Sequence, residues 1–100
     1  MKATTRDYIA RGLRKLSTET HQGTNHINEL IKLLNLHGYQ LGNKTLDQYN
    51  PDMTFKCNIW EIEDSSGNVQ DHKISLTEDF YPEGTYQYKN DYLRVHSYIS

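Results

Sequence analysis

The apolar residues of this 100-residue chain change their spacing once, between Gly38 and Pro51. Before that point they recur every three or four residues, which is the period of one face of an α-helix. Beyond it they alternate with polar residues, as in a half-buried β-strand. A chain of this length can bury one hydrophobic core. We therefore expect a single α+β domain, residues 1–100, with two N-terminal helices packed on an antiparallel sheet of three to four strands.

The first part of the chain predicts two helices, at about residues 5–18 and 24–37. Their apolar stripes are Ile9, Leu13 and Leu16 in the first helix, and Ile27, Leu30, Ile31, Leu33 and Leu34 in the second. Gly38 follows the second stripe, at the position where a left-handed glycine commonly ends a helix. Both stripes are expected to face the sheet.

The second part predicts strands at about residues 53–63, 69–77, 84–89 and 92–99, after a linker at 38–52. The first strand carries apolar residues of both parities, so a bulge or burial on both faces is needed near Ile59 and Trp60. The strand residues expected to meet the helices are Phe55, Cys57, Ile59, Ile74, Leu76, Leu93 and Val95.

The end of the chain is rich in tyrosine. We favour a two-residue hairpin loop at Asn90 and Asp91, which would place Tyr86 and Tyr88 in the core; a three-residue loop or one unbroken strand would turn them outward. Under either arrangement one strand face has no aliphatic residue. Tyrosine and arginine are enriched where protein partners bind most tightly. We therefore predict a partner-binding surface on this face, consisting of Tyr92, Arg94, His96 and Tyr98.

Charge is distributed unevenly along the chain. Residues 1–45 carry seven Lys or Arg against three Asp or Glu, whereas residues 46–100 carry four against ten. An acidic surface is suited to occupying the basic groove of a nucleic-acid-processing protein. Attraction between the two halves of the molecule is the simpler explanation. The acids assigned to the predicted partner contact are Glu61, Glu63 and Asp91.

The sequence contains no motif for catalysis or metal binding. Cys57 is the only cysteine, which excludes an intrachain disulfide and a cysteine-based zinc site within one chain. The five histidines include no HExxH motif. His72 and His96 would form an acid–base pair only if the fold brought them together. We expect no enzymatic activity, no cofactor, no membrane-spanning segment and a cytoplasmic location.

These features favour a small non-enzymatic binding protein that acts through protein–protein contact. The chain's size and composition are typical of accessory proteins of phages and mobile elements, and the narrower hypothesis is inhibition of a nucleic-acid-processing complex. One alternative is self-association as a homodimer through an uncovered edge strand. The other is nucleic-acid binding through the basic side of the first helix, by Arg6, Arg11, Arg14 and Lys15.

Overall fold

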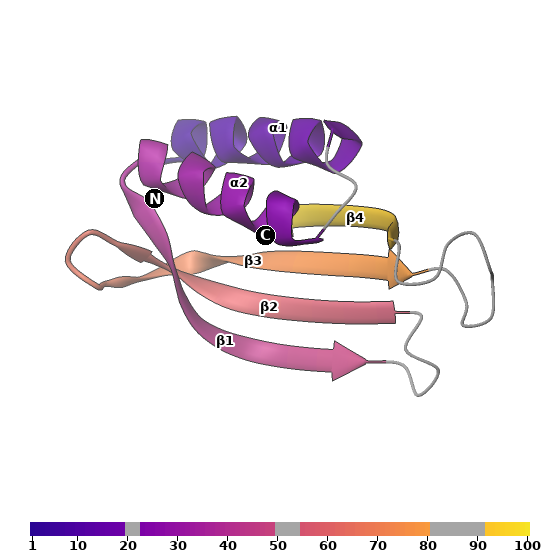
Figure 1. Ribbon diagram of the computed structural model, residues 1–100. Coiled ribbons are helices and arrows are strands. Elements are labelled where there is room, and N and C mark those ends of the chain that lie inside the picture. Colours follow the sequence, from indigo (N-terminus) through magenta and orange to yellow (C-terminus); the bar gives the residue numbers. More distant parts are fainter. Residues whose placement is uncertain (20–22, 50–54, 81–91) are drawn as a thin grey trace.

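The computed structural model describes residues 1–19, 23–49, 55–80 and 92–100. Within these residues the elements are, in chain order, the helices α1 (Ala3–Glu19) and α2 (Gly23–Leu36) and the strands β1 (Tyr39–Tyr49), β2 (Phe55–Asp64), β3 (Val69–Phe80) and β4 (Tyr92–Ile99). Each strand pairs antiparallel with the next, in the sheet order β1-β2-β3-β4. Both helices lie on one side of this sheet (Figure 1), so the predicted α+β class is confirmed.

The helices bury most of the predicted apolar stripes. The fully buried members are Ile9, Leu13, Leu30 and Leu34. Three further members, Leu16, Ile27 and Leu33, are partly buried and pack against them. Ile31 is 36% exposed, so its assignment to the core is wrong. It lies about 100° around the helix from Leu30, beyond the part of α2 that faces the sheet.

Two glycines shape the helical layer. Gly38 follows α2 with a φ angle of 83°, which is the left-handed conformation predicted for this position. Gly12 lies where α1 meets α2. A Cβ atom at Gly12 would stand 2.6 Å from Cδ2 of Leu33. The missing side chain therefore lets the two helices approach each other closely.

The predicted linker is wrong for residues 39–49, because these residues form β1 and pair with β2. The pairing register shifts twice, between Leu41 and Lys44 and again between Lys44 and Leu46. This segment contains Gly42, which is a poor strand former, and it lacks a regular alternation of apolar residues. Its extended conformation is stabilised by pairing with β2 rather than by its own propensity.

The strand faces differ from the prediction in β2. Asn58, Trp60 and Ile62 are buried beneath the helices. The residues of the other parity, Phe55, Cys57 and Ile59, are only partly buried and face away from the helices, so their assignment to the main core is wrong. Apolar residues on both parities therefore reflect a strand with two apolar faces. Among the described residues, the buried core consists of Ile9, Leu13, Leu30, Leu34, Trp60, Ile62, Ile74, Leu76, Val95 and Ile99.

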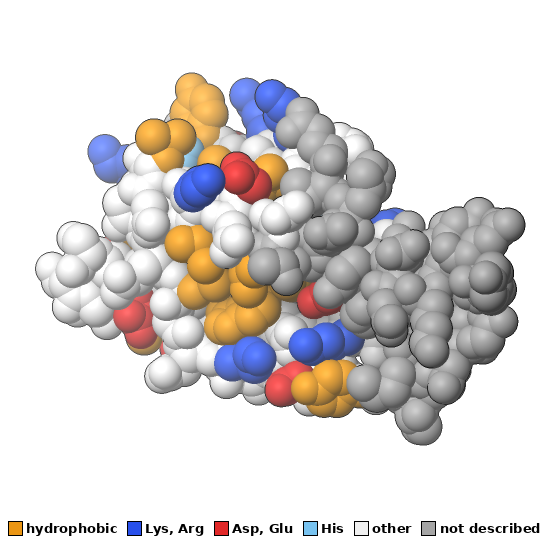
Figure 2. All heavy atoms as spheres, in the orientation of Figure 1, with side chains coloured by type: hydrophobic (Ala, Val, Ile, Leu, Met, Phe, Trp, Pro, Cys, Tyr) orange, Lys and Arg blue, Asp and Glu red, His pale blue; other side chains and the backbone are white. Residues whose placement is uncertain are grey.

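The helices leave one side of this core close to solvent, near β1. Figure 2 shows apolar side chains gathered below α2, with Lys or Arg side chains beneath them. Two lysines lie over aromatic rings in this part of the sheet: the Nζ of Lys44 is 5.5 Å from the Trp60 ring centroid, and the Nζ of Lys56 is 5.5 Å from that of Tyr49. Such side chains cover apolar surface with their stems while the charge stays in water.

In the described part of the sheet, β1 and β4 are the outer strands, and both edges have features that oppose pairing with another strand. At the β4 edge, α1 supplies hydrogen-bond partners: the backbone N–H of Ser97 donates to Ser17 Oγ at 3.2 Å, and Arg6 Nη2 donates to the carbonyl of Ile99 at 3.0 Å. At the β1 edge, the register shifts flank Lys44. Bulges, charged side chains and covering helices are the usual ways in which proteins protect sheet edges.

Several predictions lie outside the described residues. These are the strand at 84–89, the loop at Asn90 and Asp91, and the placement of Tyr86 and Tyr88. The side chains of Tyr92 and Leu93 are also outside them, although the backbone of both residues belongs to β4.

Candidate functional site

The sheet face turned away from the helices carries side chains from all four strands. Strand pairing arranges them in rows, because directly opposed residues of an antiparallel pair share a face. One row crosses the whole sheet and consists of Leu46, Ile59, Ser75 and Tyr98. The next row consists of Gln48, Cys57, Thr77 and His96, and a shorter row consists of Phe55, Asp79 and Arg94. We refer to these three rows as the open face.

The open face holds apolar side chains among polar ones. In most antiparallel sheets with one covered face, the other face is polar. Here Leu46 and Tyr98 are 37% and 56% exposed, and Phe55, Cys57 and Ile59 are partly exposed. Within the described ranges, no helix or strand packs on this face (Figure 1). An apolar surface of this kind is typical of a contact site for another molecule.

Side-chain size varies across the open face. The third strand contributes the small residues Ser75 and Thr77 near the middle. Larger side chains stand on either side of them, with Ile59 on β2 and Tyr98 on β4. Small residues between larger ones give a partner side chain space to insert, and a rigid sheet holds this arrangement before binding.

The three described β4 side chains of the predicted site, Arg94, His96 and Tyr98, do share the open face. The rings of His96 and Tyr98 meet edge to face, with centroids 5.3 Å apart. Arg94 Nη2 lies 3.1 Å from Asp79 Oδ2. Burial lowers the pKa of His96, and the Arg94 charge adds to this, while Asp79 opposes it. His96 is therefore neutral near pH 7, and its Nδ1 atom is buried without a hydrogen-bond partner.

The predicted acids lie apart from these β4 side chains. Glu61 is one row beyond Ile59, opposite Lys73 of β3. Glu63 lies further along β2, where its Oε1 accepts a hydrogen bond of 3.2 Å from Gln40 Nε2. Both acids thus flank one end of the open face, on a strand separated from β4 by β3. Asp91 lies outside the described residues.

Other acids of the second half of the chain have structural contacts or are buried. Glu78 is only 7% exposed and faces the helix side of the sheet. Asp64 accepts hydrogen bonds from the backbone N–H groups of Ser66 and Asn68 in the hairpin between β2 and β3. The hydrogen bonds from Asn68 are the main reason why the pKa of Asp64 is lowered. The acidic character of this half is therefore spread over several parts of the molecule.

The basic residues of α1 also have different surroundings. Arg6 is bound to the end of the chain, since its Nη2 and Nε donate to the carbonyls of Ile99 and Ser100 at 3.0 and 3.3 Å. Arg11 lies 5.9 Å from the ring centroid of Tyr8. Arg14 and Lys15 are exposed. The basic surface of α1 is thus narrower than predicted, because Arg6 is directed towards β4.

The two histidines proposed as a pair do not form a common site. The Nδ1 atom of His72 is 2.6 Å from the carbonyl oxygen of Ser100, and His72 shares the parity of buried Ile74. His96 lies on the opposite, open face. The acid–base chemistry that would need both side chains in one site has no geometric basis here.

A buried His–Ser contact was not expected from the sequence. His26 Nε2 of α2 lies 2.7 Å from Ser97 Oγ of β4, and the two residues are 0% and 1% exposed. Burial is the main cause that lowers the pKa of His26, and nearby His96 adds to it. No substrate can reach these atoms, so the contact joins the helix to the sheet. The helical spacing could have predicted that His26 is buried, because it precedes the buried Leu30 and Leu34 by four and eight residues.

Within the described ranges, no three His, Cys, Asp or Glu residues are placed to hold a metal ion. Neither α1 nor α2 has the length and apolar character needed to cross a membrane. Comparisons with known protein families, curated proteins and solved structures found no match.

Proposed function

We propose that the chain is a non-enzymatic binding protein whose open face contacts another protein. The observation that carries this proposal is a sheet face with exposed apolar and aromatic side chains on which no described element packs. Covering such a face is favourable by about 25 cal/mol for each Å² of apolar surface removed from water. A partner of matching shape would provide the second layer that the described helices provide on the other side.

Tyr98 and Arg94 are the expected anchors of the contact. Both are exposed, at 56% for the whole Tyr98 residue and 66% for the Arg94 side chain. Tyrosine and arginine contribute most when a ring of weaker contacts excludes water around them. The partly exposed Ile59 and Cys57 lie on the same face, beyond Ser75 and Thr77 of β3, and are suited to that role. Because both sheet edges are protected, we expect a partner to bind on the face rather than by adding a strand.

A narrower proposal is that the partner belongs to a nucleic-acid-processing complex, which a phage or mobile-element accessory protein would inhibit. Its support is Glu61 and Glu63, which border the open face and would meet basic residues of such a partner. This proposal predicts that binding weakens as salt concentration rises, since the contact would include exposed opposite charges.

Affinity capture from the organism that encodes the chain tests the proposal. The bait is the wild-type protein, and the test variant combines Arg94→Ala with Tyr98→Ala. The matched control combines Arg14→Ala with Tyr8→Ala, which removes one exposed arginine and one exposed tyrosine from α1. We expect a partner that the wild type and the control capture and the open-face variant loses. A partner retained by the open-face variant would contradict the proposal.

Nucleic-acid binding through α1 is the second candidate. It is supported by Arg11, Arg14 and Lys15, which lie on the exposed side of this helix. Such binding would fall steeply with salt and would be lost in Arg11→Ala combined with Arg14→Ala. A gel-shift or polarisation assay with single- and double-stranded DNA and RNA at low salt measures this. Absence of any shift would remove the candidate.

A further inference from the structure

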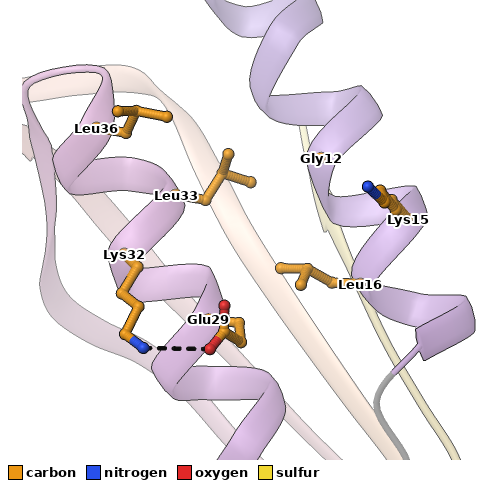
Figure 3. Close-up of a pocket in the computed structure, with 7 residues that line it drawn as sticks. All are labelled: Gly12, Lys15, Leu16, Glu29, Lys32, Leu33 and Leu36. Carbon is orange, nitrogen blue, oxygen red and sulfur yellow. Dashed lines mark hydrogen bonds and ion pairs between the residues drawn. The ribbon is translucent and has the colours of Figure 1, made fainter.

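The helical layer contains a groove on the opposite side of the molecule from the open face. It lies between α1 and α2 and has a volume of about 470 Å³. The residues that line it are Gly12, Lys15, Leu16, Glu29, Lys32, Leu33 and Leu36. Figure 3 shows that Leu16 and Leu33 point from their two helices into the space between them. The proposed function makes no use of this surface.

The groove has an apolar floor that no described helix or strand covers. Gly12 contributes no side chain, so nothing from α1 projects into the groove where Leu33 approaches this helix. Leu16 and Leu33 are partly buried, whereas Leu36 at the end of α2 is 78% exposed. These three leucines supply the apolar part of the groove lining. Single exposed apolar residues are common, but several that line one groove are typical of a binding site.

The length of the groove suits a helix. Its α2 wall runs from Glu29 to Leu36, which is seven residues or about 10 Å along the helix axis. Two turns of another helix have the same length. An amphipathic helix binds such grooves through apolar side chains at i, i+3 or i+4, and i+7.

The charged residues around the groove indicate which charge a partner should carry. Lys15 stands on the α1 rim and Lys32 on the α2 rim. Glu29 is 3.3 Å from Lys32 Nζ, but the Lys32 side chain is 73% exposed and an ammonium group has three donors. Acidic residues beside the apolar anchors of a partner would therefore be attracted, and basic residues would be repelled.

We infer that the groove between α1 and α2 binds an amphipathic helix of another protein, with acidic residues flanking apolar residues at i, i+3 or i+4, and i+7. The bound helix would form a third helix of the layer above the sheet. This site is independent of the open face, so the chain would be able to hold two partners at once.

Selection from a helical peptide library tests this inference. The library fixes leucine at i, i+4 and i+7 and randomises the other positions among Glu, Lys, Gln and Ala. Parallel selections use the wild type and Leu36→Ser, which changes a residue too exposed to be needed for folding. Ile31→Ser is the matched control, since Ile31 is also exposed on α2 but does not line the groove.

We expect the selected peptides to be rich in Glu beside the leucines. Their affinity should fall at least about tenfold for Leu36→Ser and several-fold for Lys32→Glu, and should be unchanged for Ile31→Ser. Chemical shifts perturbed by the peptide should map to both helices. Recovery of no peptide, enrichment of Lys, equal affinity for Leu36→Ser, or shifts confined to the open face would each overturn the inference.

Discussion

The two faces of the sheet are built by the same strands but differ in what covers them. The helix-facing side carries Trp60, Ile62 and Ile74, which are buried. The open face carries Ile59 and Tyr98, which remain partly or largely exposed. Residue type alone does not explain this difference, because isoleucine occurs on both faces of β2. Burial of one face follows from the position of α1 and α2, and the other face keeps apolar surface that the described elements do not use.

The largest difference between the two faces should appear in stability. Ile62→Ala removes a fully buried side chain beneath the helices, and we expect a loss of about 2–5 kcal/mol in the free energy of unfolding. Ile59→Ala makes the same chemical change three residues earlier in the strand, on the open face. Its loss should be about 1 kcal/mol, because Ile59 is only partly buried. Urea denaturation of both variants measures the contrast, and equal losses would show that the open face belongs to a second core.

A smaller loss in the free energy of unfolding is expected for the buried polar contact between His26 and Ser97 on the helix-facing side. Ser97→Ala leaves the buried Nε2 of His26 without the hydroxyl that lies 2.7 Å from it. A buried polar group that loses its partner costs about 1–3 kcal/mol. Ser75→Ala is the matched control, because Ser75 lies on the open face. A loss for Ser75→Ala as large as that for Ser97→Ala would contradict the contrast between the faces.

The hydrogen bonds that hold the β4 edge against α1 should contribute still less to the free energy of unfolding. Arg6→Met keeps an unbranched side chain about as long as the aliphatic part of arginine, but it removes the hydrogen bonds to the carbonyls of Ile99 and Ser100. We expect a loss of about 1 kcal/mol, since the guanidinium is partly exposed and water replaces some of the interaction. Amide hydrogen exchange should also become faster in β4. Unchanged exchange at Ser97 and Ile99 would show that α1 does not need Arg6 to hold this edge.

The smallest expected effect is a change of stability with pH. Burial holds the pKa of His26 below 6.5 in the folded chain, whereas the unfolded chain binds a proton near that value. The unfolded state therefore binds more protons as pH falls, and the free energy of unfolding decreases. Between pH 7.5 and 6.0 this loss is at most about 0.8 kcal/mol for His26. Denaturation at both pH values measures it, and His26→Gln should show a shallower slope. An increase in stability at pH 6.0 would contradict the burial of a neutral His26.

Much of this fold could be predicted from the sequence, because the spacing of apolar residues reflects local secondary structure. Helical spacing located both helices, and Gly38 marked the end of the second. β1 was missed because Gly42 and an irregular pattern hide a strand whose conformation depends on β2. The prediction also chose the wrong set of alternating β2 residues to face the helices. Both parities of that strand are apolar, so only the position of the helices decides which one is buried.

The candidate site was predicted in part for the same reason. Alternation along the last strand placed Arg94, His96 and Tyr98 on one face. It gave no indication that Ile59 and Cys57 would share this face, because that depends on the pairing of β2 and β4 with β3. The groove between the helices was not predicted either. It results from Gly12 and Leu33, which are distant in sequence and meet only in the folded chain.

One measurement tests the difference between the faces most directly, namely the affinity of the captured partner for two threonine variants. Thr77→Arg places a long charged side chain in the middle of the open face, and Thr18→Arg makes the same change on the exposed side of α1. We expect binding about a hundredfold weaker for Thr77→Arg, with the free energy of unfolding within about 1 kcal/mol of wild type, and unchanged binding for Thr18→Arg. Unchanged affinity for Thr77→Arg would contradict the assignment of the open face as the partner-binding surface.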